Sequence, residues 1–143
     1  MGDFHLRNYS EDIMAEGVNK EFMRTLAHIL LPHVYIVGTC VHSDSEENVN
    51  TAIDVADELY TSGICLPVVP ALTYYWEKRH PRGYEFYNEY CFQIMKRCDA
   101  VFIDEVAEGA DWHIDELAEA QRLDLPIFWS TGDLQNWVED GAE

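Results

Sequence analysis

Short runs of β-branched and aromatic residues alternate along this chain with segments whose apolar residues recur at helical spacing. The runs span residues 34–37, 64–69, 100–104 and 126–130, and helical patterns occupy residues 44–60, 84–96, 111–123 and 134–138. Strands separated by helices pair in parallel, and the helices then cover both faces of the sheet. The sequence therefore predicts an α/β fold with a mainly parallel sheet. Because Pro67 interrupts the second run, we expect a bulge or an edge strand there.

The segment before the first run has a helical pattern of its own. Its apolar residues recur at helical spacing until Pro32 ends the pattern, at Met14, Val18, Phe22, Leu26, Ile29 and Leu30. A chain of 143 residues, 48% of them hydrophobic, suits one core rather than two. We therefore expect an N-terminal helical extension over residues 1–33 and a single α/β domain over residues 34–143.

Charge excludes one class of partner. The formal net charge is −18, and from Asp99 onward thirteen acidic residues accompany one base, Arg122. Binding to DNA or RNA depends on neutralising phosphates, so we expect no nucleic-acid partner. The sequence shows neither a secretory signal nor an apolar run of about 20 residues, which argues against a membrane partner and for a cytoplasmic protein.

The cysteines and histidines lack the spacing of metal ligands. The four cysteines, Cys40, Cys65, Cys91 and Cys98, form no CxxC pair, and the six histidines are scattered. Three of the cysteines lie in apolar contexts that suit a small buried thiol. We therefore expect no disulfide, no metal site and no cofactor.

The stretch after the third run carries the best candidate for chemistry. A polar loop follows residues 100–103, Asp111 is a plausible N-cap, and Glu116 falls in the first turn of the next helix. Such a loop opens at the carboxyl end of a strand, where open parallel sheets bind ligands. A first-turn glutamate is also favoured by the helix dipole alone, so a solvated Glu116 is the alternative interpretation.

Several motifs, taken in order, resemble the nucleoside 2-deoxyribosyltransferase family. They are the Tyr-x-x-Gly strand end at Tyr35 and Gly38, the Cys-Asp-Ala-Val strand entry at residues 98–101, and a helix with Glu116, Ala120 and Pro126. Each motif is weak alone, but their order and spacing are moderately specific over residues 34–130. The resemblance implies a flavodoxin- or Rossmann-like three-layer sandwich that assembles as a homo-oligomer.

The resemblance also implies an activity, the cleavage or exchange of the N-glycosidic bond of 2′-deoxyribonucleosides or their 5′-monophosphates. Glu116 matches the nucleophile of that family, which attacks the anomeric carbon, and a carboxylate suits the oxocarbenium character that develops there. Tyr35 matches a tyrosine close to the sugar. Asp99 is a further catalytic candidate, and a structural residue at the entry of its strand is the alternative interpretation. The candidates for substrate binding are Gly38, Thr39, Cys40, Trp76, Cys91, Asp111 and Trp112.

Three positions depart from the family pattern and keep alternatives open. Cys91 stands where the family usually has an aspartate that assists the leaving base, and Ala110 and Trp112 replace a polar residue and a glycine before the nucleophile. Glu89 or Asp111 could substitute from nearby. A nucleotide-binding protein without the chemistry is therefore one alternative, and an interaction protein with an acidic surface is another.

The aromatic residues Trp76, Tyr74 and Tyr75 also have two interpretations. They could stack on a base or pack within the core.

Overall fold

The computed structural model describes Glu21 and residues 30–37, 46–103 and 114–141. The chain divides between Leu31 and Pro32 into an N-terminal unit and an α/β unit. The helix expected before Pro32 lies, apart from Glu21, outside the described residues. No helix in the described part of the chain is long and apolar enough to cross a membrane.

The α/β unit alternates strands and helices. Its elements are β1 (His33–Val37), α3 (Glu46–Thr61), β2 (Leu66–Val68), the 3₁₀ turn η1 (Pro70–Leu72), α4 (Thr73–Arg79), α5 (Tyr84–Met95), β3 (Ala100–Ile103), α6 (Ile114–Arg122), β4 (Ile127–Phe128) and α7 (Thr131–Glu139). Strands β2 and β4 are shorter than the runs that predicted them. Helix α7 begins earlier than predicted because Ser130 caps it, its hydroxyl accepting from the Asp133 amide at 3.2 Å.

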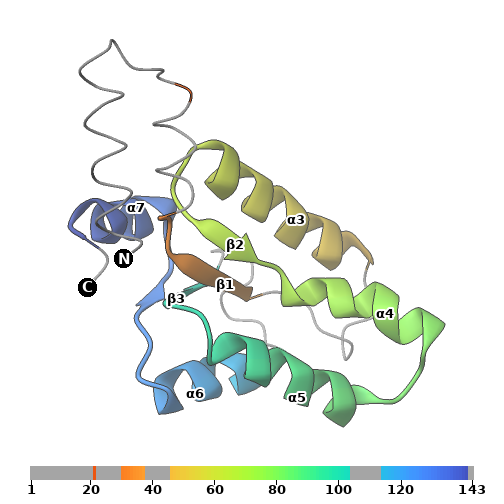
Figure 1. The fold of residues 1–143 in the computed structure, drawn as a ribbon. Coiled ribbons are helices and arrows are strands. Elements are labelled where there is room, and N and C mark those ends of the chain that lie inside the picture. Colours follow the sequence, from red (N-terminus) through yellow and green to blue (C-terminus); the bar gives the residue numbers. More distant parts are fainter. Residues whose placement is uncertain (1–20, 22–29, 38–45, 104–113, 142–143) are drawn as a thin grey trace, which may run out of the picture. The chain divides into compact units, whose positions relative to one another are not determined.

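The four strands form one parallel sheet in the order β2-β1-β3-β4 (Figure 1). Strand β1 pairs with β3 from Val34 opposite Ala100 to Val37 opposite Ile103. The structure confirms the predicted α/β fold with its parallel sheet. It also places the Pro67 strand at an edge, one of the two positions that the proline predicts.

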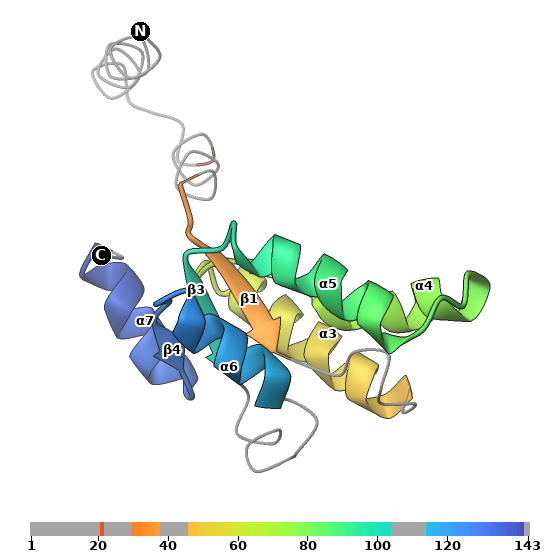
Figure 2. The same cartoon turned by 90° about the horizontal axis from the view of Figure 1, so that it is seen from below.

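Alternate residues of the central strands pack against different helices. Tyr35, Val37, Val101 and Ile103 share a core with α5 and α6, whereas their neighbours along the strands pack with α3 and α7. Because side chains alternate across a strand, strands buried on both faces are apolar throughout. The result is a three-layer sandwich of the flavodoxin-like kind, with α5 and α6 on one face of the sheet (Figure 2).

The strand order identifies where this fold offers a ligand site. The chain passes from β1 outward to β2, then crosses back over β1 to β3 and continues to β4. The order therefore reverses between β1 and β3, whose last residues Val37 and Ile103 are register partners. Open α/β sheets bind ligands beyond the carboxyl ends of the strands at such a reversal.

Candidate functional site

Glu116 is buried, with 1% of its surface exposed. It lies in the first turn of α6, and Ala120, one turn further on the same side of the helix, is also fully buried. The pattern that directs Ala120 toward the sheet therefore directs Glu116 there as well. The interpretation of Glu116 as a solvated first-turn residue is wrong, since its neighbour Asp115 has the exposed position.

Tyr35 binds this buried carboxylate. Its hydroxyl donates to Oε2 of Glu116 at 2.6 Å, a bond that joins residues 81 positions apart in the sequence. Tyr35 lies in the middle of β1, is fully buried, and belongs to the core shared with α5 and α6. This distance lies at the short end of the range for a hydrogen bond between two oxygens. The bond offsets part of the cost of burying the carboxylate and fixes the orientation of that group.

A second tyrosine holds the same turn of α6 from another element. The hydroxyl of Tyr84, the first residue of α5, donates to Oδ2 of Asp115. The first turn of α6 is therefore bound to β1 through Glu116 and to α5 through Asp115. The sequence pattern does not reveal this contact, because nothing in it indicates that the first turns of α5 and α6 lie together.

Replacing Tyr84 by Phe should loosen the first turn of α6. The amides of residues 118–120 donate to carbonyls of that turn. We expect these amides to exchange with solvent roughly 3- to 10-fold faster, because a hydrogen bond of this kind contributes about 1 kcal/mol. Tyr75→Phe is the matched control, since it removes only a 3.3 Å bond to Glu46. Equal exchange rates in α6 for both variants would show that Tyr84 does not hold the turn.

Asp99 lies at the other end of the sheet. It immediately precedes β3, accepts from the His33 amide at 2.8 Å, and is 3.7 Å from Nδ1 of His33. Its own amide donates to the His33 carbonyl at 2.7 Å. These bonds join the amino ends of β1 and β3, whereas Glu116 binds Tyr35 in the middle of β1. The structure therefore does not support the predicted catalytic role of Asp99 and gives it a structural one.

Cys91 is part of the core. Its side chain is fully buried between α5 and the sheet, on the same stripe of α5 as Tyr87 and Met95. The structure therefore does not support the predicted substrate contact. The described cysteines form no disulfide, and burial raises the pKa of Cys65 to about 12 and that of Cys98 to about 11. These two are structural thiols, as their apolar contexts predict.

Trp76 packs α4 against α5. Its ring contacts the rings of Phe86, Tyr87 and Tyr90 edge to face, with centroids 4.9 to 6.2 Å apart. This geometry corresponds to favourable aromatic packing. For Trp76, the structure therefore favours the packing alternative over base stacking.

The remaining predicted binding residues, Gly38, Thr39, Cys40, Asp111 and Trp112, lie outside the described residues. The strands that lead into their segments are nevertheless neighbours, because Val37 pairs with Ile103. In the described part of the chain, no group of three His, Cys, Asp or Glu residues is placed to hold a metal ion.

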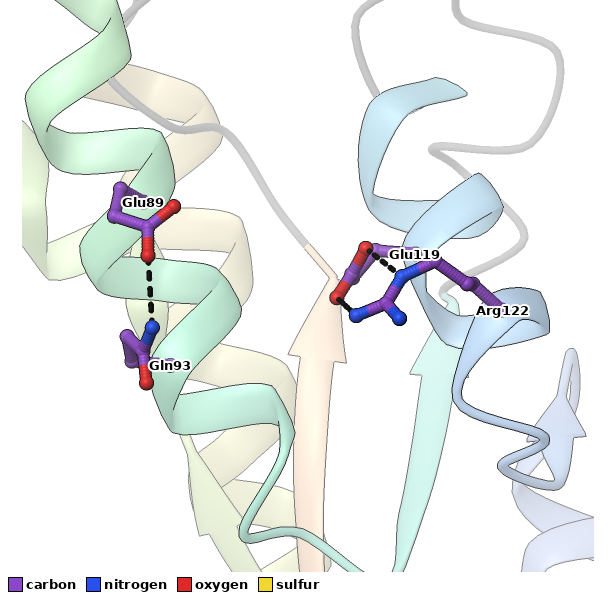
Figure 3. Close-up of polar contacts among 4 residues, drawn as sticks. All are labelled: Glu89, Gln93, Glu119 and Arg122. Atoms are coloured by element: carbon purple, nitrogen blue, oxygen red, sulfur yellow. Dashed lines mark hydrogen bonds and ion pairs between the residues drawn. The ribbon is translucent and has the colours of Figure 1, made fainter.

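Two other acidic residues, one on α5 and one on α6, form hydrogen bonds within their own helix (Figure 3). Glu89, a possible substitute for the missing aspartate, is exposed on α5 and accepts from Gln93 at 2.7 Å. Glu119 on α6 accepts two bonds from Arg122, at 2.6 and 3.0 Å. The Arg122 guanidinium, through these bonds, holds the pKa of Glu119 below its usual 4.5.

Replacing Arg122 by Gln should lower stability in a pH-dependent way. Because the pKa of Glu119 is lower in the folded chain, the pair stabilises the fold fully at neutral pH. Its contribution is lost as pH falls below 4.5 and Glu119 takes up a proton. We expect the melting temperature of the variant to be lower than that of the wild type at pH 7 and to converge with it in acid. A difference in melting temperature that stays constant from pH 7 into acid would show that protonation of Glu119 does not control the contribution of the pair.

No protein-family model, curated protein or solved structure matches this chain. The geometry around Glu116 and the motifs in the sequence are therefore the observations that bear on function.

Proposed function

We propose that this protein cleaves or exchanges the N-glycosidic bond of 2′-deoxyribonucleosides or their 5′-monophosphates, with Glu116 as the nucleophile. The observation that carries the proposal is the buried Glu116 carboxylate, bound by Tyr35 at the reversal point of the sheet. A fixed carboxylate at a ligand-binding edge is what glycosyl transfer requires. The family resemblance of the motifs at Tyr35, Cys98 and Glu116 supports the same chemistry.

The reaction proceeds in two displacements. One oxygen of Glu116 forms a bond to C1′ while the C1′–N bond breaks, and its electron pair leaves with the base, which takes a proton from an acid or from water. The glycosyl ester is then attacked at C1′ by water or by a second base, and Glu116 is regenerated. Tyr35, which binds Oε2, orients the carboxylate for the first step.

The loops beyond β1 and β3 are proposed to complete the site. Gly38, Thr39 and Cys40 follow the end of β1, and Asp111 and Trp112 precede α6. A glycine permits close approach of the backbone to a ligand, and amides in such a loop suit a sugar hydroxyl or a 5′-phosphate. We further propose a cytoplasmic homo-oligomer with a nucleoside or nucleotide as its small-molecule partner.

The second candidate function is nucleotide binding without turnover. It is favoured by Cys91, which occupies the position of the aspartate that assists base departure in the family. A thiol lacks the carboxyl group with which that aspartate assists the leaving base. If no other acid protonates the leaving base, the site would bind a nucleotide and leave its glycosidic bond intact.

One experiment separates these functions. The wild-type chain is incubated with a panel of 2′-deoxynucleosides and their 5′-monophosphates, with and without an acceptor base, and the released base is measured by chromatography. Calorimetric titrations with the same ligands report binding. Release supports the glycosyl chemistry, binding without release supports the second candidate, and the absence of both would contradict the two.

A further inference from the structure

The edge strand β2 is poorly suited to extend the sheet into another chain. The Leu66 amide donates to the Pro32 carbonyl at 2.8 Å, so the backbone groups of Leu66 and, by alternation, of Val68 face β1. Those of Pro67 then face outward, where proline has no N–H to donate. The Pro67 carbonyl can still accept a hydrogen bond, but a partner at this edge must bind mainly through side chains.

Two hollows lie beside β2, one toward α3 and one toward α5. The hollow toward α3, of about 370 Å³, is lined by Ile53, Ala56, Asp57, Tyr60, Leu66 and Pro67. The hollow toward α5, of about 530 Å³, is lined by residues that include His33, Val68, Tyr90, Ile94, Arg97 and Cys98. Ile53, Tyr60, Leu66 and Tyr90 are 37 to 41% exposed, so apolar side chains reach the surface in both hollows.

Few charged residues line these two hollows, although the chain as a whole is strongly acidic. Two copies with a formal charge of −18 repel each other, so they can meet only where acidic residues are sparse. Among the described residues that line the two hollows, Asp57 is the acidic one and Arg97 is the one lysine or arginine. Asp99 lies close by, 3.7 Å from Nδ1 of His33. Asp57 lies near the end of α3, just before β2, and Arg97 follows α5, just before β3. Both therefore lie near the amino ends of the strands, on opposite faces of the sheet.

We propose that the β2 edge, with its two hollows, is the interface with a second copy of this chain, related by a twofold axis parallel to the strands. That axis sets the α3 side of one protomer against the α5 side of the other. Asp57 then lies at the same level along the strand direction as Arg97 of the partner subunit. The contact between them occurs twice, as a twofold interface requires. An axis perpendicular to the sheet would instead bring the Asp57 end of α3 beside the acidic first turn of the partner's α3, so charge disfavours it.

Size-exclusion chromatography with light scattering, run on the wild-type chain over a range of concentrations, should give the mass of a dimer. Ile53→Glu and Leu66→Glu should each raise the dimer dissociation constant at least about 30-fold, since each places a charge in an apolar contact. Phe86→Glu is the matched control, because Phe86 is 44% exposed but lines neither hollow, and it should leave the dimer intact. Circular dichroism melts identify any variant that fails to fold.

A charge exchange tests the orientation of the two copies. Asp57→Arg and Arg97→Asp should each weaken the dimer, and the double variant should restore it because both contacts are re-formed with reversed sign. A wild-type monomer, or a dimer that Ile53→Glu and Leu66→Glu leave unchanged, would overturn the proposed interface. Failure of the double variant to restore a dimer that both single variants weaken would overturn the proposed axis. None of these outcomes depends on glycosidase activity.

Discussion

Glu116→Gln should lose base release from 2′-deoxynucleotides while the chain keeps its fold. Gln has nearly the shape of Glu and still offers an oxygen to the Tyr35 hydroxyl, so the packing around α6 is preserved. An amide oxygen is a far weaker nucleophile than a carboxylate, and removing a nucleophile lowers turnover by on the order of 10³- to 10⁶-fold. The measurement is the rate of base release at saturating substrate, compared with the wild type.

The same substitution should not lower stability. A carboxylate that is 1% exposed is costly to bury, and Gln avoids the cost of burying a charge. We expect a free energy of unfolding equal to that of the wild type or greater by up to about 2 kcal/mol. Glu119→Gln is the matched control, since it changes a glutamate on the same helix that binds Arg122 instead of Tyr35. Equal turnover in Glu116→Gln and Glu119→Gln would rule out Glu116 as the nucleophile.

Tyr35→Phe should produce the second-largest effect. It keeps the buried ring and removes the hydroxyl that donates to Glu116 at 2.6 Å. A hydrogen bond to a charged group contributes about 1.5–3 kcal/mol, so we expect base release to slow by about 10- to 100-fold. Stability should fall by a similar free energy, because the buried carboxylate loses this donor.

A double-mutant cycle distinguishes this coupling from a general disturbance of β1. In the Glu116→Gln background the acceptor carries no charge, so Tyr35→Phe should cost clearly less stability than in the wild type. The measurement is urea unfolding of the two single variants, the double variant and the wild type. Additive effects would mean that Tyr35 stabilises the core without regard to the carboxylate.

Local sequence patterns predict much of the fold. The runs that form β1 and β3 are short, apolar and bounded by polar segments, because both strands are buried on both faces. The second run is shortened to Leu66–Val68, where Pro67 has no amide to donate. Helix α4 was harder to predict, because its aromatic residues serve contacts with α5 that depend on the tertiary fold.

The candidate site can be predicted only in part from local sequence patterns. The position of Glu116 after a strand is visible in the sequence, but its bond to Tyr35 depends on the register of β1 with β3. The positions of two other candidates, in contrast, could be derived from the sequence. Asp99 precedes its strand and so belongs to the amino end, and Cys91 shares the helical stripe of Tyr87 and Met95, which indicates the core.

The most direct test of the central claim is to trap the glycosyl-enzyme. The chain is mixed with a 2′-deoxynucleotide that it turns over, quenched in acid within milliseconds, and analysed by intact-mass and peptide mass spectrometry. The account predicts a deoxyribosyl adduct on the peptide that contains Glu116, absent from Glu116→Gln and present in Glu119→Gln. Base release at the wild-type rate by Glu116→Gln, or an adduct on a different residue, would contradict it.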